Sequence, residues 1–253
     1  MTELLAVENL NKHFGGLHAV KNVSFKIQRG EIVGILGPNG AGKTTLYNLL
    51  TGFIPPDPGA RIVFEGRSLL GLAPHRIAGL GISRTFQLCR PFVGMNVLEN
   101  VVVGALGAKH APGTDLEAMA QQLLNRVGLG DKAEVAVEVL SYGDQRRLEI
   151  ARALAAKPSL LLLDEPFAGL GSGEIDDLSA LIRQVHADEG LTVMLIEHKL
   201  REFMRLVDRV IALDFGEVIA EGLPDDIVNV PAVIEAYIGR GQASDTPEPA
   251  DAA

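Results

Sequence analysis

The sequence predicts an α/β fold with a mostly parallel core sheet, an N-terminal antiparallel β part and an inserted helical subdomain. Short apolar runs at 32–36, 160–163 and 191–196 alternate with helical patterns, which is typical of a parallel sheet buried on both faces. A glycine-rich loop directly follows the first of these runs. The region of about 88–158 is rich in helical patterns and interrupts the β-α-β order, so we expect it to form the helical subdomain.

The composition is that of an ordinary globular protein. Of the 253 residues, 47% are hydrophobic and 22% are charged, and the formal net charge is −9. This acidic balance argues against nucleic acid as the main partner. Cys89 is the only cysteine, which excludes an internal disulfide and a cysteine-based zinc site.

The chain shows no apolar run long enough for a membrane span, and its first eight residues do not resemble a secretory signal. We therefore expect a cytosolic protein with a single domain over residues 1–240. The remaining residues, 241–253, are small and acidic and include prolines, so they are expected to be disordered.

The glycine-rich loop reads GPNGAGKTT and has the flanks that a phosphate-binding loop requires, an apolar strand before it and a helical pattern after it. Glycines let successive N–H groups converge on a phosphate, and a helix that begins near Lys43 adds its positive dipole end. Lys43 supplies a positive charge for the β- and γ-phosphates, and Thr44 offers a hydroxyl to Mg²⁺. An incidental glycine-rich turn is disfavoured because both spacing and flanks match. The predicted nucleotide-binding residues are Gly37, Pro38, Asn39, Gly40, Ala41, Gly42, Lys43, Thr44 and Thr45.

Polar side chains follow three predicted strands at the edge where ligands bind in open α/β sheets. Asp164 can hold Mg²⁺ directly or through water, and Glu165 can act as general base towards the water in line with the γ-phosphate. His198 and Gln87 can each be merely structural. Their positions at neighbouring strand ends make His198 a candidate γ-phosphate contact and Gln87 a candidate link between Mg²⁺ and the helical subdomain. Phe14 can stack on an adenine ring or fill a hairpin core, and the sequence pattern favours neither role.

The segment LSYGDQ at 140–145, which runs into RRLEIARAL, resembles the signature motif of ATP-binding subunits of ABC transporters. The resemblance extends from Val7 to about Ile238. It implies an ABC-type nucleotide-binding domain of the P-loop NTPase class that hydrolyses ATP, with ATP and Mg²⁺ as cofactors. It also implies particular roles for the residues already singled out: catalysis by Lys43, Gln87, Glu165 and His198, Mg²⁺ binding by Thr44, Gln87 and Asp164, and adenine stacking by Phe14.

The resemblance further implies a head-to-tail dimer with an identical or paralogous subunit. In such a dimer the signature of one subunit meets the γ-phosphate bound to the other. Tyr142 stands where glycine is frequent, and Gly171 stands where Asp or Asn is usual in the loop that links the two sites. The residues assigned to the signature are Ser141, Tyr142, Gly143, Asp144 and Gln145.

Three further segments, GISRTFQ at 81–87, MNVLEN at 95–100 and IEHKL at 196–200, are similar to the LivG-like branch of branched-chain amino acid uptake. Membership of that branch implies a peripheral subunit at the cytoplasmic face of the inner membrane. Its partners would be integral membrane permease subunits and, indirectly, a periplasmic or extracellular substrate-binding protein. The alternatives are an ATPase of amide or urea uptake or of lipopolysaccharide export, a soluble ABC ATPase acting on ribosomes or DNA, and a regulatory subunit with little hydrolysis. The expected permease contact is a groove beside Gln87 that includes Arg84, Arg90, Pro91 and Phe92, unless these residues form a solvated loop.

Overall fold

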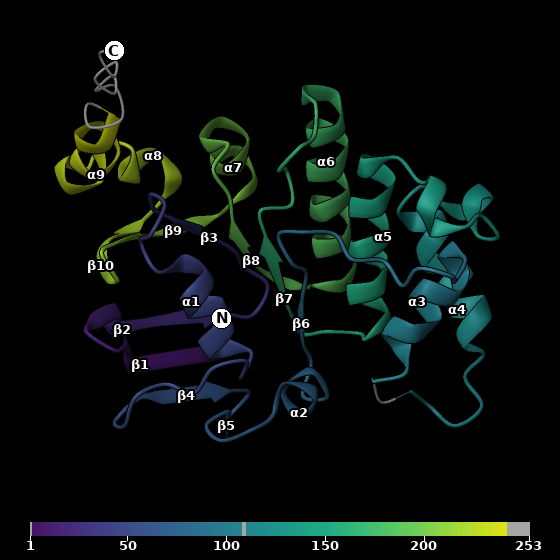
Figure 1. The fold of residues 1–253 in the computed structure, drawn as a ribbon, viewed down its shortest axis with the longest axis horizontal. Coiled ribbons are helices and arrows are strands. Elements are labelled where there is room, and N and C mark those ends of the chain that lie inside the picture. Colours follow the sequence, from purple (N-terminus) through teal and green to yellow (C-terminus); the bar gives the residue numbers. More distant parts are fainter. Residues whose placement is uncertain (1, 108–109, 242–253) are drawn as a thin grey trace, which may run out of the picture.

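The computed structural model describes residues 2–107 and 110–241, so the predicted tail at 241–253 lies almost entirely outside the described residues. The described residues form two sheets with flanking helices (Figure 1). The N-terminal sheet has the strand order β2-β1-β4-β5, and each pair of neighbouring strands in it is antiparallel, which confirms the predicted antiparallel part. Its strands are β1 (Glu3–Phe14), β2 (Leu17–Gln28), β4 (Arg61–Phe64) and β5 (Arg67–Ser68).

The core sheet has the strand order β10-β9-β3-β8-β7-β6. Its first five strands along the chain pair in parallel, and only β10 is antiparallel, to β9. The mostly parallel sheet that the sequence predicts is therefore confirmed. Its strands are β3 (Ile32–Leu36), β6 (Ile82–Arg84), β7 (Leu160–Asp164), β8 (Thr192–Ile196), β9 (Arg209–Asp214) and β10 (Glu217–Gly222).

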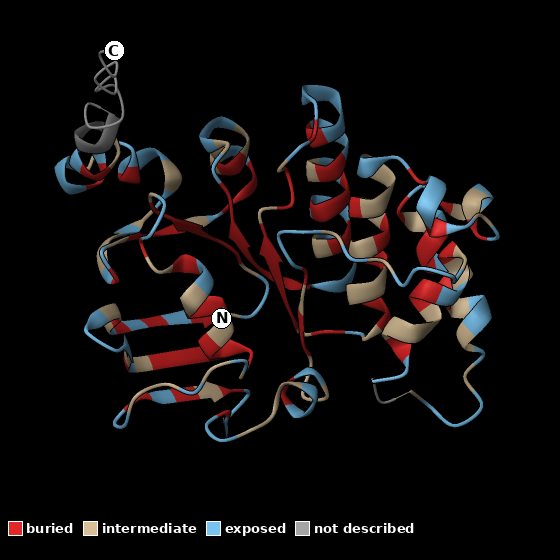
Figure 2. Ribbon diagram, viewed as in Figure 1, coloured by how far each residue is buried: buried red, intermediate tan, exposed pale blue. Residues whose placement is uncertain are grey.

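Every residue of β3, β7 and β8 is buried because both faces of the core sheet are covered (Figure 2). Alternate residues enter two different hydrophobic clusters. In β7, Leu161 and Leu163 pack in the cluster that includes α6 (Ser172–Glu189). Leu160 and Leu162 pack in the cluster formed with the N-terminal sheet. This double burial explains why these strands are apolar throughout rather than alternating.

Three helices pack against one another at one end of the molecule, to the right in Figure 1. Each begins at a residue whose side chain accepts hydrogen bonds from the first turn: Asn96 in a capping box with Glu99, then Asp115, then Ser141. The limits of 88 and 158 for a helical subdomain stay a prediction. The three helices are α3 (Val97–Ala105), α4 (Leu116–Arg126) and α5 (Tyr142–Ala155).

Besides α6, the remaining helices are α1 (Lys43–Leu50), α2 (Pro74–Ala78), α7 (Leu200–Leu206), α8 (Pro224–Ile227) and α9 (Pro231–Gly241). Of these helices, α6 and α7 connect strands of the core sheet, α1 and α2 lie on the connections between the two sheets, and α8 and α9 follow β10. Two short 3₁₀ helices, Gly130–Lys132 and Val137–Val139, lie between α4 and α5. No helix in the described residues is both long and apolar enough to cross a membrane.

Candidate nucleotide-binding site

The glycine-rich loop joins β3 to α1, as the sequence predicts. Two of its glycines have backbone angles that favour glycine, with φ of 81° at Gly40 and 100° at Gly42. A Cβ atom at Gly42 would lie 2.6 Å from the Ala19 carbonyl oxygen, and one at Gly37 would lie 2.3 Å from the Leu213 carbonyl oxygen. Larger residues at either end would therefore push the loop away from the strands that support it.

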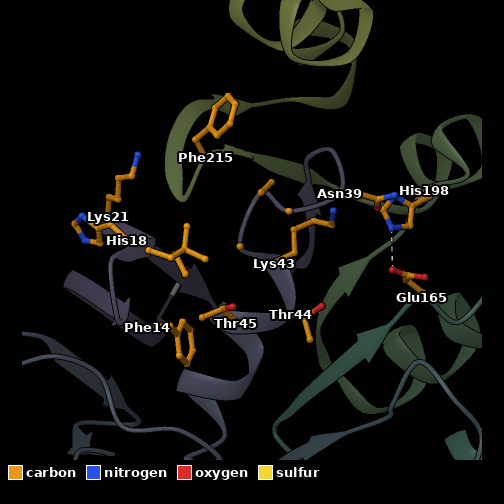
Figure 3. Close-up of a pocket in the computed structure, with 15 residues that line it drawn as sticks. Phe14, His18, Lys21, Asn39, Lys43, Thr44, Thr45, Glu165, His198 and Phe215 are labelled. Carbon is orange, nitrogen blue, oxygen red and sulfur yellow. Dashed lines mark hydrogen bonds and ion pairs between the residues drawn. The ribbon is translucent and has the colours of Figure 1, made fainter. Parts of the chain in front are cut away.

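A cavity of about 500 Å³ lies against this loop (Figure 3). That volume falls within the range of ligand pockets in proteins. Lys43 begins α1 in the wall of the cavity, and its Nζ donates to the carbonyl oxygens of Gly37 (2.6 Å) and Pro38 (2.9 Å). Phe14, the aromatic residue with two open interpretations, is 46% exposed and lines the cavity, so it does not fill a hairpin core. The cavity is lined by residues 39–45 together with Phe14, Leu17, His18, Ala19, Lys21, Glu165, His198 and Phe215.

Three of the predicted catalytic residues meet at one carboxylate. The Oε1 atom of Glu165 lies 2.8 Å from Nε2 of His198, and Oε2 accepts a hydrogen bond from Nε2 of Gln87 at 2.9 Å (Figure 3 shows the contact with His198). Glu165 also has a φ of 51°, a backbone conformation that is uncommon for a residue with a side chain and is often found at functional sites. The arrangement fixes both oxygens of the carboxylate at the edge of the cavity.

Asp164 is buried beneath this edge and pairs with Arg84. Its side chain is 3% exposed, and its Oδ2 accepts from Nη2 of Arg84, itself 6% exposed, at 2.7 Å. Nη1 of Arg84 donates to Oδ1 of Asn48 on α1 at 2.6 Å, so one guanidinium joins β6, β7 and the helix of the phosphate-binding loop. The sequence assigned Arg84 to a docking surface and missed this role, because nothing local marks a partner 80 positions away.

Glu197 is a second functional candidate that the sequence analysis missed. It is only 2% exposed, and its carboxylate accepts backbone N–H groups from Phe167 (2.5 Å), His198 (3.0 Å) and Lys199 (3.4 Å). Burial raises the pKa of this carboxyl, although the three N–H donors oppose the shift. Glu197 thereby ties the turn after β7 to the turn after β8. Its position directly after a wholly apolar strand is the sequence feature that could have identified Glu197.

The predicted signature residues lie at a separate site, at the start of α5. Ser141 Oγ accepts from the Asp144 N–H at 3.1 Å, and Asp144 pairs with Lys132 at 2.6 Å. A Cβ atom at Gly143 would lie 2.5 Å from Oε1 of Glu174, so a larger residue there would displace the Glu174 side chain. Within one chain this motif does not line the cavity beside Lys43; Ser141, Gly143 and Asp144 line a separate hollow. The other two members make local contacts: the Tyr142 hydroxyl accepts from Arg146 and the Gln145 amide donates to the Leu140 carbonyl.

A groove of about 480 Å³ runs between α2, β6 and α5. Arg84 and Arg90 line it, as predicted, together with Phe53 and Phe86, whose rings meet edge to face with centroids 5.8 Å apart. The other two residues predicted for this surface, Pro91 and Phe92, are not among its lining residues.

Comparison with known proteins shows the family of the chain. The family model of the ABC transporter matches residues 20–168, and that of the branched-chain amino acid ATP-binding cassette transporter matches residues 217–243. The chain is 43% identical over 251 residues to the high-affinity branched-chain amino acid transport ATP-binding protein LivG of Salmonella typhimurium, covering 94% of this chain and 98% of that protein.

Two solved structures are similar over nearly their whole length. The ADP conformation of MJ1267, an ATP-binding cassette of an ABC transporter, has a TM-score of 0.86 at 32% identity and covers 94% of this chain and 100% of that one. A dimeric post-hydrolysis state of the cassette MJ0796, bound to ADP and Pi, has a TM-score of 0.77 at 27% identity and covers 87% of this chain and 99% of that one. The chain therefore belongs to the ATP-binding proteins of ABC transporters, in their LivG-like branch.

Proposed function

We propose that this chain hydrolyses ATP to power an importer of branched-chain amino acids. The observation that carries the catalytic part is the Glu165 carboxylate, held between Gln87 and His198 at the edge of the cavity that Lys43 lines. The substrate class rests on the similarity to LivG and on the match of residues 217–243 to the branched-chain cassette model.

The phosphates of ATP would lie against the N–H groups of the loop and the start of α1, where the helix dipole favours negative charge. Lys43 would exchange its two carbonyl contacts for the charged β- and γ-phosphates, because charge-assisted hydrogen bonds are the stronger ones. Glu165 would orient the attacking water and take its proton, while His198 would contact the γ-phosphate. Phosphoryl transfer of this kind depends mainly on positioning and charge neutralisation.

Mg²⁺ fits the oxygen donors of the site, since hydroxyl, carboxylate and amide oxygens are its usual ligands. We assign it to Thr44, Asp164 and Gln87, which come from α1, the end of β7 and the segment after β6. Bound there, the ion would neutralise charge on the β- and γ-phosphates. The Arg84 contact occupies Oδ2 of Asp164 and orients the carboxylate.

A second copy or a paralogue would complete the cavity in a head-to-tail dimer. This assignment is supported by the separate hollow of about 190 Å³ that Ser141 and Gly143 line with Glu174, away from the Lys43 of their own chain. The solved dimer of the similar cassette MJ0796 also supports it. The proposal that the signature motif of one subunit completes the site of the other covers residues 141–145.

Permease subunits would bind in the groove that Arg84, Arg90 and Phe53 line, at the cytoplasmic face of the inner membrane. A substrate-binding protein would act on the permease and not on this chain. The alternative functions are amide or urea uptake and lipopolysaccharide export, each powered by the same ATPase chemistry. We expect the helical subdomain at 88–158 to be the part that moves with the permease.

The test is uptake of labelled leucine in source cells that lack this gene, complemented by wild type, by Lys43→Ala or by Lys26→Ala, a substitution of an exposed lysine on β2. We expect wild type and Lys26→Ala to restore uptake and Lys43→Ala not to. Competition with valine, amides and urea then identifies the substrate class. Normal leucine uptake without the gene would mean either that the cells have a second leucine system or that this transporter carries another substrate.

A further inference from the structure

Tyr237 connects the C-terminal helix to the phosphate-binding loop. It lies on α9, which packs against β10, and its partly buried ring packs against the hydrophobic cluster on that face of the core sheet. Its hydroxyl oxygen accepts a hydrogen bond from the Gly37 N–H at 3.0 Å, across 200 positions of sequence. Figure 1 shows α9 at the end of the molecule where β9 and β10 lie.

Gly37 is the first residue of the loop, and both of its backbone polar groups are engaged. Its N–H binds Tyr237, and its carbonyl accepts from Nζ of Lys43 at 2.6 Å. The close approach to the Leu213 carbonyl on β9 leaves the residue little room to shift. The position of Gly37 is thus linked directly to the lysine that would bind the phosphates.

The same C-terminal part of the chain also holds the other end of the loop. The Gly216 N–H, in the turn between β9 and β10, donates to the Ala41 carbonyl at 3.1 Å. Burial first, and then the charge of Asp214, raise the pKa of Tyr237, against the opposing effect of the Gly37 bond, so the hydroxyl stays protonated and can accept this bond as a neutral group. Residues 217–243 form the stretch that matches the branched-chain cassette model, and Tyr237 lies inside it.

We propose that Tyr237 is a positioning residue for the phosphate-binding loop: its hydroxyl fixes Gly37, and thereby sets where Lys43 rests and how tightly nucleotide binds. The inference rests on the proposed nucleotide site. Preorganised loops bind more tightly because ordering them costs no further free energy on binding. The C-terminal helix is then part of the nucleotide site and not an appendage.

The test is Tyr237→Phe in the full chain, because this change removes the hydroxyl and keeps the ring in its cluster. We expect the ADP dissociation constant, measured by calorimetry, to rise about three- to tenfold, the range expected for one neutral hydrogen bond. Hydrogen exchange of the Gly37 amide, followed by NMR without nucleotide, should be faster by a similar factor. The melting temperature should fall by no more than about 4 °C for a chain of this size.

Ile234→Ala, at a 41% exposed position of α9, is the control for disturbance of the helix surface and should leave ADP affinity and Gly37 exchange unchanged. A wild-type ADP affinity in Tyr237→Phe would overturn the inference, and a lowered melting temperature without any change in affinity would assign Tyr237 a purely structural role. Failure of the wild-type protein to bind ADP would instead overturn the nucleotide site on which the inference depends.

Discussion

The Nε2 atom of His198 lies 2.8 Å from Oε1 of Glu165, while Gln87 donates to the other carboxylate oxygen. Each contact comes from a different segment of the chain, after β8 and after β6. The carboxylate is therefore held in one orientation before any substrate arrives. A general base must lie within hydrogen-bond reach of the proton that it takes, and this orientation meets the geometric part of that requirement.

Glu165→Gln should bind ATP normally and hydrolyse it about 10²- to 10⁴-fold more slowly, because the amide keeps the shape of the carboxylate but accepts no proton. Phosphate release and equilibrium ATP binding measure the two properties. Slow turnover should let ATP-bound dimers accumulate, which light scattering with ATP and Mg²⁺ detects.

Glu235→Gln, at an exposed position of α9, is the matched control and should turn over ATP like the wild type. Equal turnover in wild type and Glu165→Gln would favour the regulatory subunit that the sequence left as an alternative. Monomers alone in light scattering would contradict a dimer of the free subunit.

Lys43→Ala should weaken ATP binding about 10- to 150-fold, since a hydrogen bond to a charged group contributes about 1.5–3 kcal/mol. The wild-type ammonium donates to two carbonyls of the loop, so its removal also leaves the loop less ordered. Calorimetry gives the dissociation constant. Lys43→Arg keeps the positive charge but not the compact shape of the ammonium, so its ATP dissociation constant should lie between those of wild type and Lys43→Ala. A wild-type dissociation constant in Lys43→Ala would show that Lys43 does not bind ATP.

The parts of this molecule that depend on local pattern were predictable from the sequence. The apolar strands β3, β7 and β8 lie within one residue of their predicted bounds. The sequence pattern predicts the first two strands at 7–14 and 23–27, which is shorter than the observed β1 and β2. Positive φ angles at Asn9 (51°) and Asn22 (47°) accompany irregular register between β1 and β2, and such irregularities interrupt the alternation by which a strand is recognised.

Long-range polar partners were not predictable. The bonds of Arg84 to Asp164, of Glu197 to Phe167 and of Tyr237 to Gly37 cross 80, 30 and 200 positions of sequence. Hydrophobic periodicity indicates which face of an element is buried, but it does not indicate which polar group of a distant element that face contacts. Only the folded arrangement of several elements supplies that information.

Arg84→Met should lower the free energy of unfolding by about 3–5 kcal/mol, because it leaves the buried Asp164 carboxylate without its partner. Arg61→Met is a matched control: Arg61 forms an ion pair with Glu8 at the same 2.7 Å, but with side chains 59% and 40% exposed against 6% and 3%. Arg61→Met should lower the free energy of unfolding by only about 0–1 kcal/mol. Urea unfolding measures both, and equal losses would contradict the importance of burial at Asp164.

Glu197 should make the stability of the protein depend on pH. Burial raises its folded-state pKa above the ordinary value of 4.5, so the folded state holds the proton more readily than the unfolded state does. The stability from this group is then fully present below about 4.5 and is lost as the pH rises through the folded-state pKa. Relative to Glu197→Gln, wild type should become less stable across that window.

Urea unfolding midpoints of wild type and Glu197→Gln, measured at several pH values from 4.5 upwards, show how the stability of each protein changes with pH. Glu235→Gln controls for the loss of one negative charge at an exposed position. A stability difference between wild type and Glu197→Gln that stays constant over the window would mean that the folded and unfolded pKa values are alike.

Cys89 should be almost inert towards iodoacetamide near pH 7. Burial, and then the negative charge of Glu149, raise the pKa of its thiol from 9.0 to about 12, which lowers the thiolate fraction roughly a thousandfold. The alkylation rate of the folded protein should therefore be far below that of the same chain in urea. Glu149→Gln removes the second cause and should speed alkylation, with Arg61→Met as the control that leaves the surroundings of the thiol intact. Equal rates in folded and unfolded protein would mean that neither burial nor Glu149 keeps the thiol of Cys89 protonated.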